Sequence, residues 1–220
     1  MLKLSEVQKQ HLIIFTRYPE PGKTKTRLIP ALGSVGAAHL QQQMTEYTLL
    51  QVGELQKAIG VSVEVRFAGG GLELMQDWLG GELLYASQGE GDLGTRMARS
   101  LVDSFRKNAE YIIIIGSDCP GVTSQILATA FQELQTVDLV LGPAIDGGYY
   151  LIGVRRFIPE LFANIDWGTS QVLQQTVDIA ADLGVSSIYL PTLADVDRPE
   201  DLSIWQEVLQ QSVYLRKTRE

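Results

Sequence analysis

Short apolar runs alternate with longer amphipathic segments along most of this chain. The clearest run, Tyr111–Gly116, holds four consecutive isoleucines and is followed directly by Ser-Asp. A β-branched run this short is typical of a strand that is buried on both faces. Such strands occur mainly in parallel sheets that helices cover on both sides. This segment is therefore predicted to be a central strand of an α/β fold.

Further apolar runs predict strands before and after this one. They are His11–Phe15, Val61–Phe67, Leu83–Ser87, Asp138–Gly142, the segment that follows the turn at Asp146 up to Gly153, and Ser186–Leu190. Apolar residues at helical spacing predict helices between these strands. The helices are Gly36–Ile59, Leu72–Leu79, the residues after the turn Gln88–Gly94 to about Asn108, Thr123–Gln135, Ser170–Leu183 and Pro199–Gln211. In the last of these, Asp197 and Glu200 have the spacing of a capping box.

The alternation of strands and helices predicts a three-layer α/β/α sandwich with a mostly parallel central sheet. No repeat, low-complexity tract or long linker interrupts the pattern, so residues 1–220 are expected to form a single domain. The longest apolar run is too short to span a bilayer, and the N-terminus lacks the apolar core of a signal peptide. We therefore expect a cytoplasmic protein with no membrane partner, either a monomer or a homodimer.

Charge narrows the choice of ligands. The net charge is −8, which argues against a nucleic-acid partner because a phosphate backbone needs a basic surface. A small phosphorylated ligand needs only a local cluster of cations. Residues 16–28 supply one, since Arg17, Lys23, Lys25 and Arg27 crowd a loop that also contains Gly22. Cations and backbone N–H groups beside a glycine suit a polyphosphate, and the alternative is a solvated basic loop.

This loop is not a Walker A motif, although Gly22, Lys23 and Thr24 imitate its end. The full motif needs a glycine five residues before its second glycine, and Arg17 stands there. The glycine-rich segment Gln88–Met97 is a second candidate, with Asp92 and Arg96 as its polar side chains. A simple strand-to-helix turn explains that segment about as well.

Asp118 follows the isoleucine strand directly, where open α/β sheets bind their ligands. Its carboxylate could hold a divalent metal, a ribose hydroxyl or a proton, or it could only cap the helix near Thr123. Cys119, the only cysteine, is expected to be a small buried residue and not a nucleophile. Asp195 and Asp197 point the same way if their segment is extended, so one of them could complete a metal site with Asp118.

Two further segments carry polar or aromatic candidates. Asp146, Gly147, Gly148 and Tyr149 form a tight turn after a strand and could contact a sugar or an acceptor, although Gly-Gly also has a plain structural use there. Trp167 could form one wall of an acceptor pocket or anchor the core. If Asp118 and Asp195 or Asp197 hold a metal, the ion is expected to be Mg²⁺ or Mn²⁺ and not zinc, because carboxylate ligands with coordination positions left open suit a hard cation.

Five motifs occur in order across nearly the whole chain and together carry a resemblance. They are P-G-K-T-K-T-R-L, G-S-D-C-P, P-A-I-D-G-G-Y-Y-L-I-G, D-W-G-T-S and D-V-D-R-P-E-D-L. With these motifs the chain resembles a bacterial family of glycosyltransferase-A-type proteins, often named nucleotide-diphospho-sugar transferases or arsenosugar-biosynthesis glycosyltransferases. That family is similar to phospholactate guanylyltransferase and to molybdenum-cofactor guanylyltransferase. The resemblance implies the Rossmann-like glycosyltransferase-A fold.

The resemblance also implies roles for residues. Arg17, Lys23, Lys25 and Arg27 lie where this superfamily holds nucleotide phosphates. Asp118 matches its metal-binding aspartate, and Asp195 and Asp197 resemble a second metal position. Two patterns depart from relatives: Gly116 replaces the first acid of a D-x-D motif, and the G-G-x-S-x-R signature is absent.

The implied activity is a metal-dependent transfer of sugar from a nucleoside-diphosphate sugar to a small acceptor. Asp118, Lys25 and Asp146 are the expected catalytic residues. Two alternatives stay open. One is a nucleotidyltransferase that joins a nucleoside triphosphate to a phosphorylated metabolite and releases pyrophosphate. The other is a non-catalytic nucleotide sensor.

Overall fold

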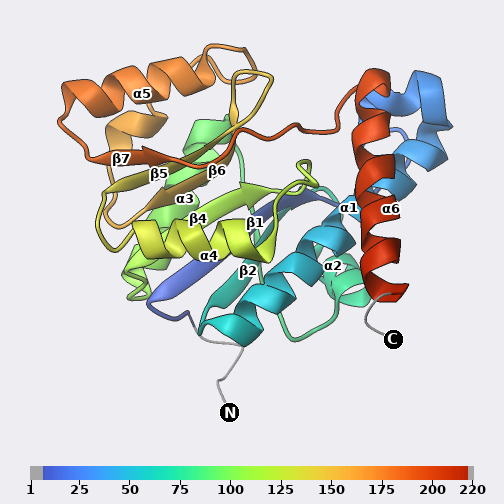
Figure 1. Cartoon of the computed structure of the whole chain (residues 1–220), viewed down its shortest axis with the longest axis horizontal. Coiled ribbons are helices and arrows are strands. Elements are labelled where there is room, and N and C mark those ends of the chain that lie inside the picture. The colour runs from blue at the N-terminus through green and yellow to red at the C-terminus, as the bar shows by residue number, and fades with distance from the viewer. Residues whose placement is uncertain (1–6, 218–220) are drawn as a thin grey trace.

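The computed structural model describes residues 7–217 of the chain, with side chains described up to residue 210. Its centre is a seven-stranded sheet in the order β3-β2-β1-β4-β6-β5-β7 (Figure 1). The strands are β1 (Gln10–Arg17), β2 (Ser62–Ala68), β3 (Leu84–Ser87), β4 (Tyr111–Gly116), β5 (Leu139–Pro143), β6 (Tyr149–Val154) and β7 (Ser187–Tyr189). Every predicted strand is present, and the isoleucine strand lies between β1 and β6.

Strand β6 runs antiparallel to both of its neighbours, β4 and β5, while the other pairs are parallel. The reason lies in the short link before it. Parallel strands need a crossover of a dozen or more residues, whereas residues 144–148 only allow a hairpin. Gly147 has a φ of 90°, and its N–H donates to the carbonyl of Ala144 at 3.1 Å. The expected turn at Asp146 therefore also reverses the chain direction.

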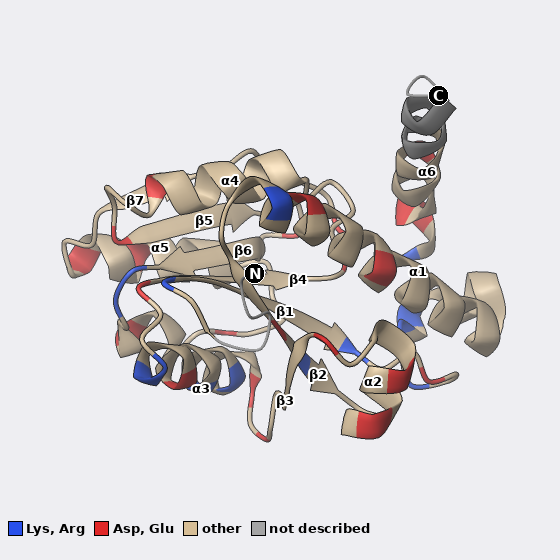
Figure 2. Cartoon of the chain, turned by 90° about the horizontal axis from the view of Figure 1, so that it is seen from below, with Lys and Arg blue, Asp and Glu red and all other residues tan. Residues whose placement is uncertain are grey.

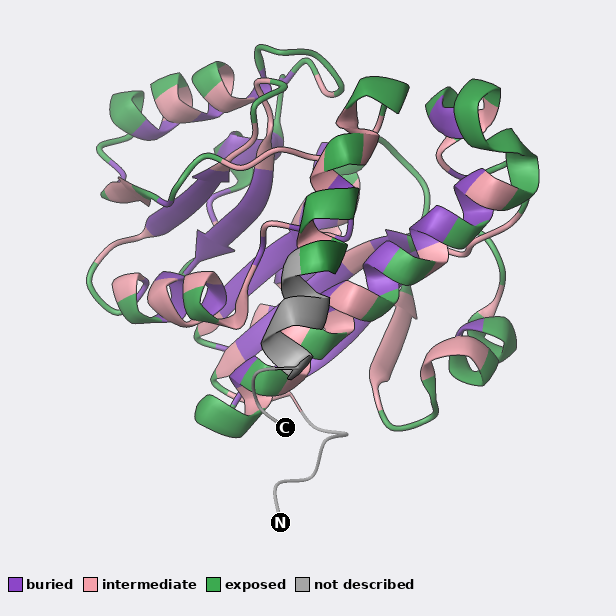
Figure 3. Ribbon diagram, turned by 45° about the vertical axis from the view of Figure 1, so that its right-hand side comes forward, coloured by how far each residue is buried: buried purple, intermediate pink, exposed green. Residues whose placement is uncertain are grey.

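Helices cover both faces of the sheet, as Figure 3 shows by the buried strands between partly exposed helices. The helices are α1 (Ile29–Ala58), α2 (Leu72–Leu79), α3 (Leu93–Arg106), α4 (Ser124–Glu133), α5 (Val172–Asp182) and α6 (Leu202–Lys217), with short 3₁₀ turns at Thr26–Leu28, Pro159–Phe162 and Pro199–Asp201. Helices α1 and α4 pack on one face and α3 and α5 on the other. The predicted three-layer sandwich with a mostly parallel sheet is confirmed.

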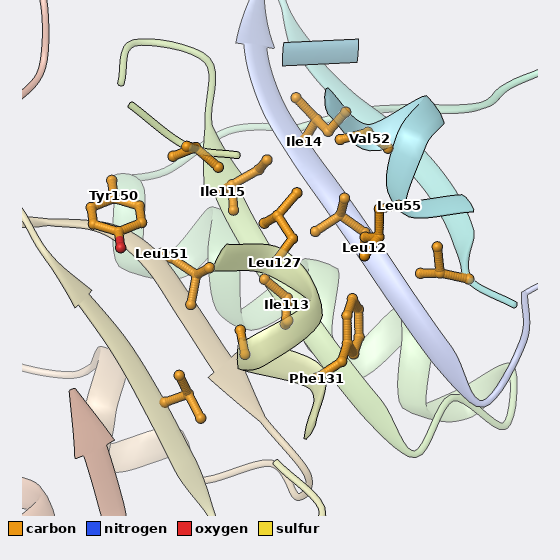
Figure 4. Close-up of a cluster of buried hydrophobic side chains, with 14 of the residues drawn as sticks. Leu12, Ile14, Val52, Leu55, Ile113, Ile115, Leu127, Phe131, Tyr150 and Leu151 are labelled. Carbon is orange, nitrogen blue, oxygen red and sulfur yellow. The ribbon is translucent and has the colours of Figure 1, made fainter. Parts of the chain in front are cut away.

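The core between the sheet and helices α1 and α4 explains why the isoleucine strand is central. Figure 4 shows Ile113 and Ile115 of β4 beside Leu127 and Phe131 of α4. The alternate residues of the same strand, Ile112 and Ile114, enter the second core on the α3 and α5 face. A strand that is buried on both faces needs apolar side chains at every position.

Two details differ from the sequence predictions. Helix α1 begins at Ile29 and not at Gly36, because Pro30 suits a first helical turn and the glycine at position 33 allows a kink with a φ of 69°. The carboxylate that caps the last helical segment is Asp201 and not Glu200. Its Oδ2 accepts the backbone N–H of Asp197 at 3.0 Å and that of Arg198 at 2.7 Å. Within residues 7–217, no helix is both long and apolar enough to cross a membrane.

Candidate active site

A cavity of about 450 Å³ opens at one edge of the sheet. The ends of β1 and β4 and the start of β6 lie at this edge, and the cavity is lined there by Thr16, Ser117 and Tyr149. Charged residues lie mostly on the helices and loops around the sheet (Figure 2). The site is therefore formed where strand ends meet loops, as expected for an open α/β sheet.

Charged side chains line the cavity, and we call the following group of them the charged half. It consists of Arg17, Lys25, Asp118, Asp195 and Asp197. The Nζ of Lys25 lies 2.7 Å from Oδ1 of Asp118 and donates to the carbonyl of Val196 at 2.6 Å. The side chain of Lys25 is only 3% exposed, whereas that of Asp118 is 55% exposed. A buried ammonium thus holds the strand-end carboxylate and the segment before α6 together.

The backbone of Lys25 is unusual. Its φ of 45° and ψ of 49° place it in the left-handed region, which costs a residue with a Cβ about 1–2 kcal/mol. Two neighbours hold the turn: the hydroxyl of Thr24 donates to the carbonyl of Tyr18 at 2.9 Å, and the N–H of Leu28 donates to the carbonyl of Lys25 at 2.9 Å. Leu28 is fully buried and anchors the end of the loop. Strain of this kind is common at functional sites.

Asp118 does not cap the following helix. The N-cap of α4 is Thr123, whose side chain accepts the N–H of Ile126 at 3.3 Å. The carboxylate of Asp118 therefore has no capping role, and it faces the cavity with Lys25 as its partner. This excludes the helix-cap alternative that the sequence left open for Asp118.

Carboxylates outnumber the cations around the cavity. Burial raises the pKa of Asp195, and the nearby carboxylates of Asp146 and Asp197 raise it further. Asp197 is paired with Arg27, and Asp146 accepts the N–H of Gly148 at 2.8 Å. An anionic ligand in this half would meet like charges unless a cation accompanied it.

The oxygen donors of the charged half fit Mg²⁺ or Mn²⁺ in chemical type. Among the residues that the structure describes, however, no three His, Cys, Asp or Glu side chains are grouped so that they could hold a metal ion. Two of the predicted metal ligands already have cationic partners, since Asp118 is paired with Lys25 and Asp197 with Arg27. These partners would have to be displaced before Asp118, Asp195 and Asp197 could bind one ion.

Apolar and aromatic side chains also line the cavity, and we call this group the apolar half. It consists of Leu93, Met97, Tyr149, Ile152, Trp167 and Val172. Met97 and Ile152 belong to the core on the α3 and α5 face, and Tyr149 and Trp167 pack against that core. The two rings meet edge to face, with centroids 6.4 Å apart. Trp167 thus anchors the core and lines the cavity at once.

Beneath the cavity lies a buried group of polar side chains that the sequence did not reveal, which we call the hydroxyl–amide cluster. It consists of Thr16, Gln41, Thr45 and Ser117. The amide nitrogen of Gln41 lies 3.1–3.2 Å from the three hydroxyls, and Thr16 and Thr45 bond at 2.9 Å. The cluster ties α1 to the ends of β1 and β4, next to Asp118. The only sequence signal is a lone Gln and Thr on the apolar face of α1.

Gln88 is a second residue that sequence reasoning did not single out. It is buried, and its amide nitrogen donates to the carbonyls of Thr16 at 3.1 Å and Arg66 at 3.0 Å. Arg99 donates to the carbonyl of Gln88 at 2.5 Å and to that of Glu90 at 2.7 Å. The loop after β3 is therefore fixed against the ends of β1 and β2, where Gln88 lines the cavity.

The structure brings together only some of the residues predicted from the sequence. Those that line the cavity are Arg17, Lys25, Asp118, Asp146, Gly148, Tyr149, Trp167, Asp195 and Asp197. Those outside its lining are Gly22, Lys23, Arg27, Asp92, Arg96 and Gly147.

The outer residues other than Gly22 have local contacts. Lys23 is exposed and paired with Glu20, and Arg27 reaches the cavity only through Asp197. Asp92 is the N-cap of α3, while Arg96 donates to the carbonyl of Gly91 at 2.8 Å. The carbonyl of Gly147 accepts the N–H of Leu173.

Cys119 lines the cavity but is buried, and its thiol donates to the carbonyl of Ala194 at 3.1 Å. Burial, followed by the carboxylates of Asp195 and Asp118, raises the pKa of this thiol to about 12. A thiol with so high a pKa is not a nucleophile at neutral pH. The expectation of a small buried residue agrees with this environment.

Comparison with known proteins places the chain in a sequence family. Residues 50–169 match the family described as "Uncharacterized protein conserved in bacteria (DUF2064)". A crystal structure from Desulfovibrio desulfuricans G20, named "putative nucleotide-diphospho-sugar transferase", is 32% identical in sequence. It superposes with a TM-score of 0.82, covering 87% of this chain and 84% of that chain. No functionally curated protein matches the sequence.

More distant structures share the fold alone. Inositol-1-phosphate CTP transferase from T. maritima superposes with a TM-score of 0.58 at 14% identity, covering 93% of this chain and 96% of that chain. Glucosyl-3-phosphoglycerate synthase from Mycobacterium tuberculosis, in complex with Mn²⁺, UDP and glucosyl-3-phosphoglycerate, superposes with a TM-score of 0.55 at 13% identity. That match covers 88% of this chain and 74% of the synthase. Both glycosyl- and nucleotidyltransferases are therefore among the fold neighbours.

Proposed function

The chain belongs to the DUF2064 family, and from this premise we propose that it is a transferase acting on a nucleoside-diphosphate sugar. The sugar passes to the hydroxyl group of a small acceptor. The name of the relative from Desulfovibrio desulfuricans supports a nucleotide-sugar substrate. One observation carries the proposal: the cations Lys25 and Arg17, the carboxylate of Asp146 and a set of apolar and aromatic side chains line one cavity. Such a cavity suits a diphosphate together with a second substrate.

Each residue of the charged half has a role in this proposal. Lys25 and Arg17 bind the diphosphate, and their positive charge stabilises the negative charge that grows on it as it leaves. Once Lys25 leaves Asp118 and Arg27 leaves Asp197, Asp118, Asp195 and Asp197 would hold Mg²⁺ or Mn²⁺, an ion that adds further charge stabilisation when bound. The hydroxyl–amide cluster joins the end of β4, directly before Asp118, to the end of β1 through the hydrogen bond from Ser117 to Thr16.

The reaction balances without a further reactant. The acceptor oxygen forms a bond to the anomeric carbon while the bond from that carbon to the diphosphate oxygen breaks. The electron pair of that bond stays on the diphosphate, and the acceptor proton passes to Asp146. Asp146 is suited to this because its carboxylate lines the cavity and is held by the N–H of Gly148. The products are a glycoside, a nucleoside diphosphate and a proton.

A second candidate function is nucleotidyl transfer, in which a nucleoside triphosphate joins a phosphorylated metabolite and releases pyrophosphate. The observation that favours it is Gly116, which stands where a D-x-D motif has its first acid. Asp118 is then the single carboxylate at the end of β4. The distant likeness to inositol-1-phosphate CTP transferase supports only the fold for this reaction.

The test is to incubate the protein with Mn²⁺ and a panel of uridine, guanosine and adenosine diphosphate sugars and triphosphates. Binding is screened first as a rise in melting temperature, since a ligand of the folded state stabilises it. Release of nucleoside diphosphate supports glycosyl transfer, and release of pyrophosphate supports the alternative. A ligand that binds and stays unchanged with every acceptor indicates a sensor. Lys25→Ala should lose binding, while Lys23→Ala, an exposed cation of the same loop, is the matched control.

A further inference from the structure

The ion pair of Lys25 and Asp118 joins a buried cation to an exposed carboxylate. The side chain of Lys25 is 3% exposed and that of Asp118 is 55% exposed, and their charged atoms lie 2.7 Å apart. The ammonium also donates to the carbonyl of Val196 at 2.6 Å. A metal ion on the other oxygen of Asp118 would lie next to this ammonium, where two positive charges repel each other. The ammonium and a metal ion therefore compete for the same carboxylate.

The backbone around this carboxylate is held without help from the ammonium. The N–H of Val196 donates to the carbonyl of Asp118 at 2.9 Å, and the thiol of Cys119 donates to the carbonyl of Ala194 at 3.1 Å. Asp195, between the two bonded residues of that segment, also lines the cavity. These bonds fix the end of β4 to the segment before α6. Removal of the ammonium should therefore free the carboxylate and leave its backbone in place.

A second ion pair, between Arg27 and Asp197, is a weaker barrier to a metal ion. The two side chains are 64% and 34% exposed, so water screens their attraction. The guanidinium of Arg27 does not line the cavity and can move into solvent. The buried ammonium of Lys25 is therefore the main obstacle.

The protein alone offers few ligands to a metal ion. Over the residues that the structure describes, no three His, Cys, Asp or Glu side chains are grouped to hold one. Mg²⁺ is often bound by only one or two carboxylates when the phosphates of a substrate complete its coordination. A diphosphate meets both needs, because it brings oxygen ligands for the ion and anionic acceptors for the ammonium.

We infer that Lys25 excludes a metal ion from Asp118 until a diphosphate draws the ammonium away. The inference rests on the proposed function, because it assigns the order in which that site is filled. In the unliganded protein, the ammonium neutralises the carboxylate. When a diphosphate binds, it accepts hydrogen bonds from the ammonium, and Asp118 is free to serve as a metal ligand. Lys25 thus controls access to the metal position and also binds phosphate.

The test is Mn²⁺ binding without any nucleotide, followed as the loss of the electron paramagnetic resonance signal of free Mn²⁺. Lys25→Gly removes the ammonium and suits the left-handed backbone. It should bind Mn²⁺ at least about tenfold more tightly than the native protein. Lys25→Met, which keeps most of the side-chain volume without the charge, should show the same gain and serves if the glycine variant does not fold. Lys23→Gly is the matched control, because it removes an exposed cation of the same loop and should leave the affinity unchanged.

Two further variants show where the ion binds. Asp118→Asn, added to Lys25→Gly, should abolish the gain in Mn²⁺ affinity, because the freed carboxylate is then absent. Arg27→Ala should raise the affinity less than Lys25→Gly does, since the pair that it breaks is exposed.

In the native protein, Mn²⁺ and a nucleoside diphosphate should promote each other's binding, because such coupling is reciprocal. UDP, GDP and ADP are each tested with and without Mn²⁺ by thermal unfolding. For a nucleotide that binds, the rise in melting temperature with both ligands should exceed the sum of the two separate rises. Mn²⁺ alone should raise the melting temperature of Lys25→Gly more than that of the native protein.

Equal Mn²⁺ affinity of the native protein and the Lys25 variants would overturn the inference, and so would a gain that survives Asp118→Asn. If the gain is absent while a nucleotide sugar is consumed with Mn²⁺, the proposed function stands without this control by Lys25. If the gain is present but no nucleoside diphosphate binds, the exclusion of the metal by Lys25 is supported and the proposed transfer is overturned.

Discussion

The left-handed backbone at Lys25 allows a test that separates its charge from its geometry. Lys25→Ala and Lys25→Gly both remove the ammonium and its bonds to Asp118 and Val196. They differ in the backbone, since alanine keeps the cost of a φ of 45° and glycine does not. We expect both variants to lose nucleotide affinity, and the glycine variant to be the more stable of the two.

The size of the difference follows from two terms. A left-handed residue with a Cβ costs about 1–2 kcal/mol, which glycine removes. Glycine also gives the unfolded chain more freedom, which takes back about 0.4–1 kcal/mol. The net gain for glycine over alanine is therefore about 0.5–1 kcal/mol. In a protein of this size, 1 kcal/mol shifts the melting temperature by about 2–4 °C, so the glycine variant should melt about 1–4 °C higher.

The assay is urea and thermal unfolding of both variants at neutral pH, with nucleotide binding measured by calorimetry. Lys23 is the control, because it lies in the same loop, is exposed and is not among the residues with positive φ. There the order should invert, with Lys23→Ala more stable than Lys23→Gly. Equal stability of the two Lys25 variants would refute the strained backbone, and unchanged affinity in both would remove Lys25 from the ligand site.

Three further predictions concern carboxylates. Asp118→Asn should keep the fold, because Asp118 caps no helix, but it should lower the melting temperature, because the buried ammonium of Lys25 is left with a neutral partner. Turnover with Mn²⁺ should fall at least about 100-fold, and normal turnover would take Asp118 out of the mechanism. Asp195→Asn should stabilise the unliganded protein at pH 7 by less than about 1 kcal/mol, measured as a rise in melting temperature. The pKa of Asp195 is raised, so its ionised form costs stability above the ordinary pKa of an aspartate. The gain in stability should shrink as the pH falls through the raised pKa, and a variant that is less stable than the native protein at pH 7 would contradict this. Glu64→Gln should lower the free energy of unfolding by about 3 kcal/mol or more, because it leaves Arg66 buried with a weaker partner. Burial alone raises the pKa of Glu64, but His11 and Arg66 outweigh burial and leave this pKa lowered. The stability difference between the variant and the native protein should therefore persist above the ordinary pKa of a glutamate and narrow in acid, and a difference that is independent of pH would argue against a role of the charge.

The sequence by itself determined the fold. Its apolar runs and helical repeats are local signals, and the structure contains each predicted strand and helix, although some ends are shifted, such as the start of α1 at Ile29 instead of Gly36. It also predicted where a ligand cavity would lie, because the carboxyl ends of parallel strands meet at one edge of a sheet whatever the details of packing. Asp118, Asp146 and the loop after β1 could be placed together on that ground alone, and they line one cavity.

Only the tertiary structure decided which residue of each predicted group faces that cavity. Lys23 and Lys25 are equivalent in the sequence, but the left-handed turn directs Lys25 inward to Asp118 and leaves Lys23 in solvent. The alternating pattern of β2 predicted a strand, yet Glu64 and Arg66 are buried as an ion pair where α3 covers that face.

Contacts between residues that are distant in the sequence also depend on the tertiary structure, so local sequence patterns could not predict them. Gln41 comes from α1 and Ser117 from the end of β4, and they meet only because α1 packs across the ends of the strands. A single polar residue on an apolar helix face gives no signal until its partners are in place. The direction of a side chain and the identity of its partner depend on packing between elements, which local patterns do not encode.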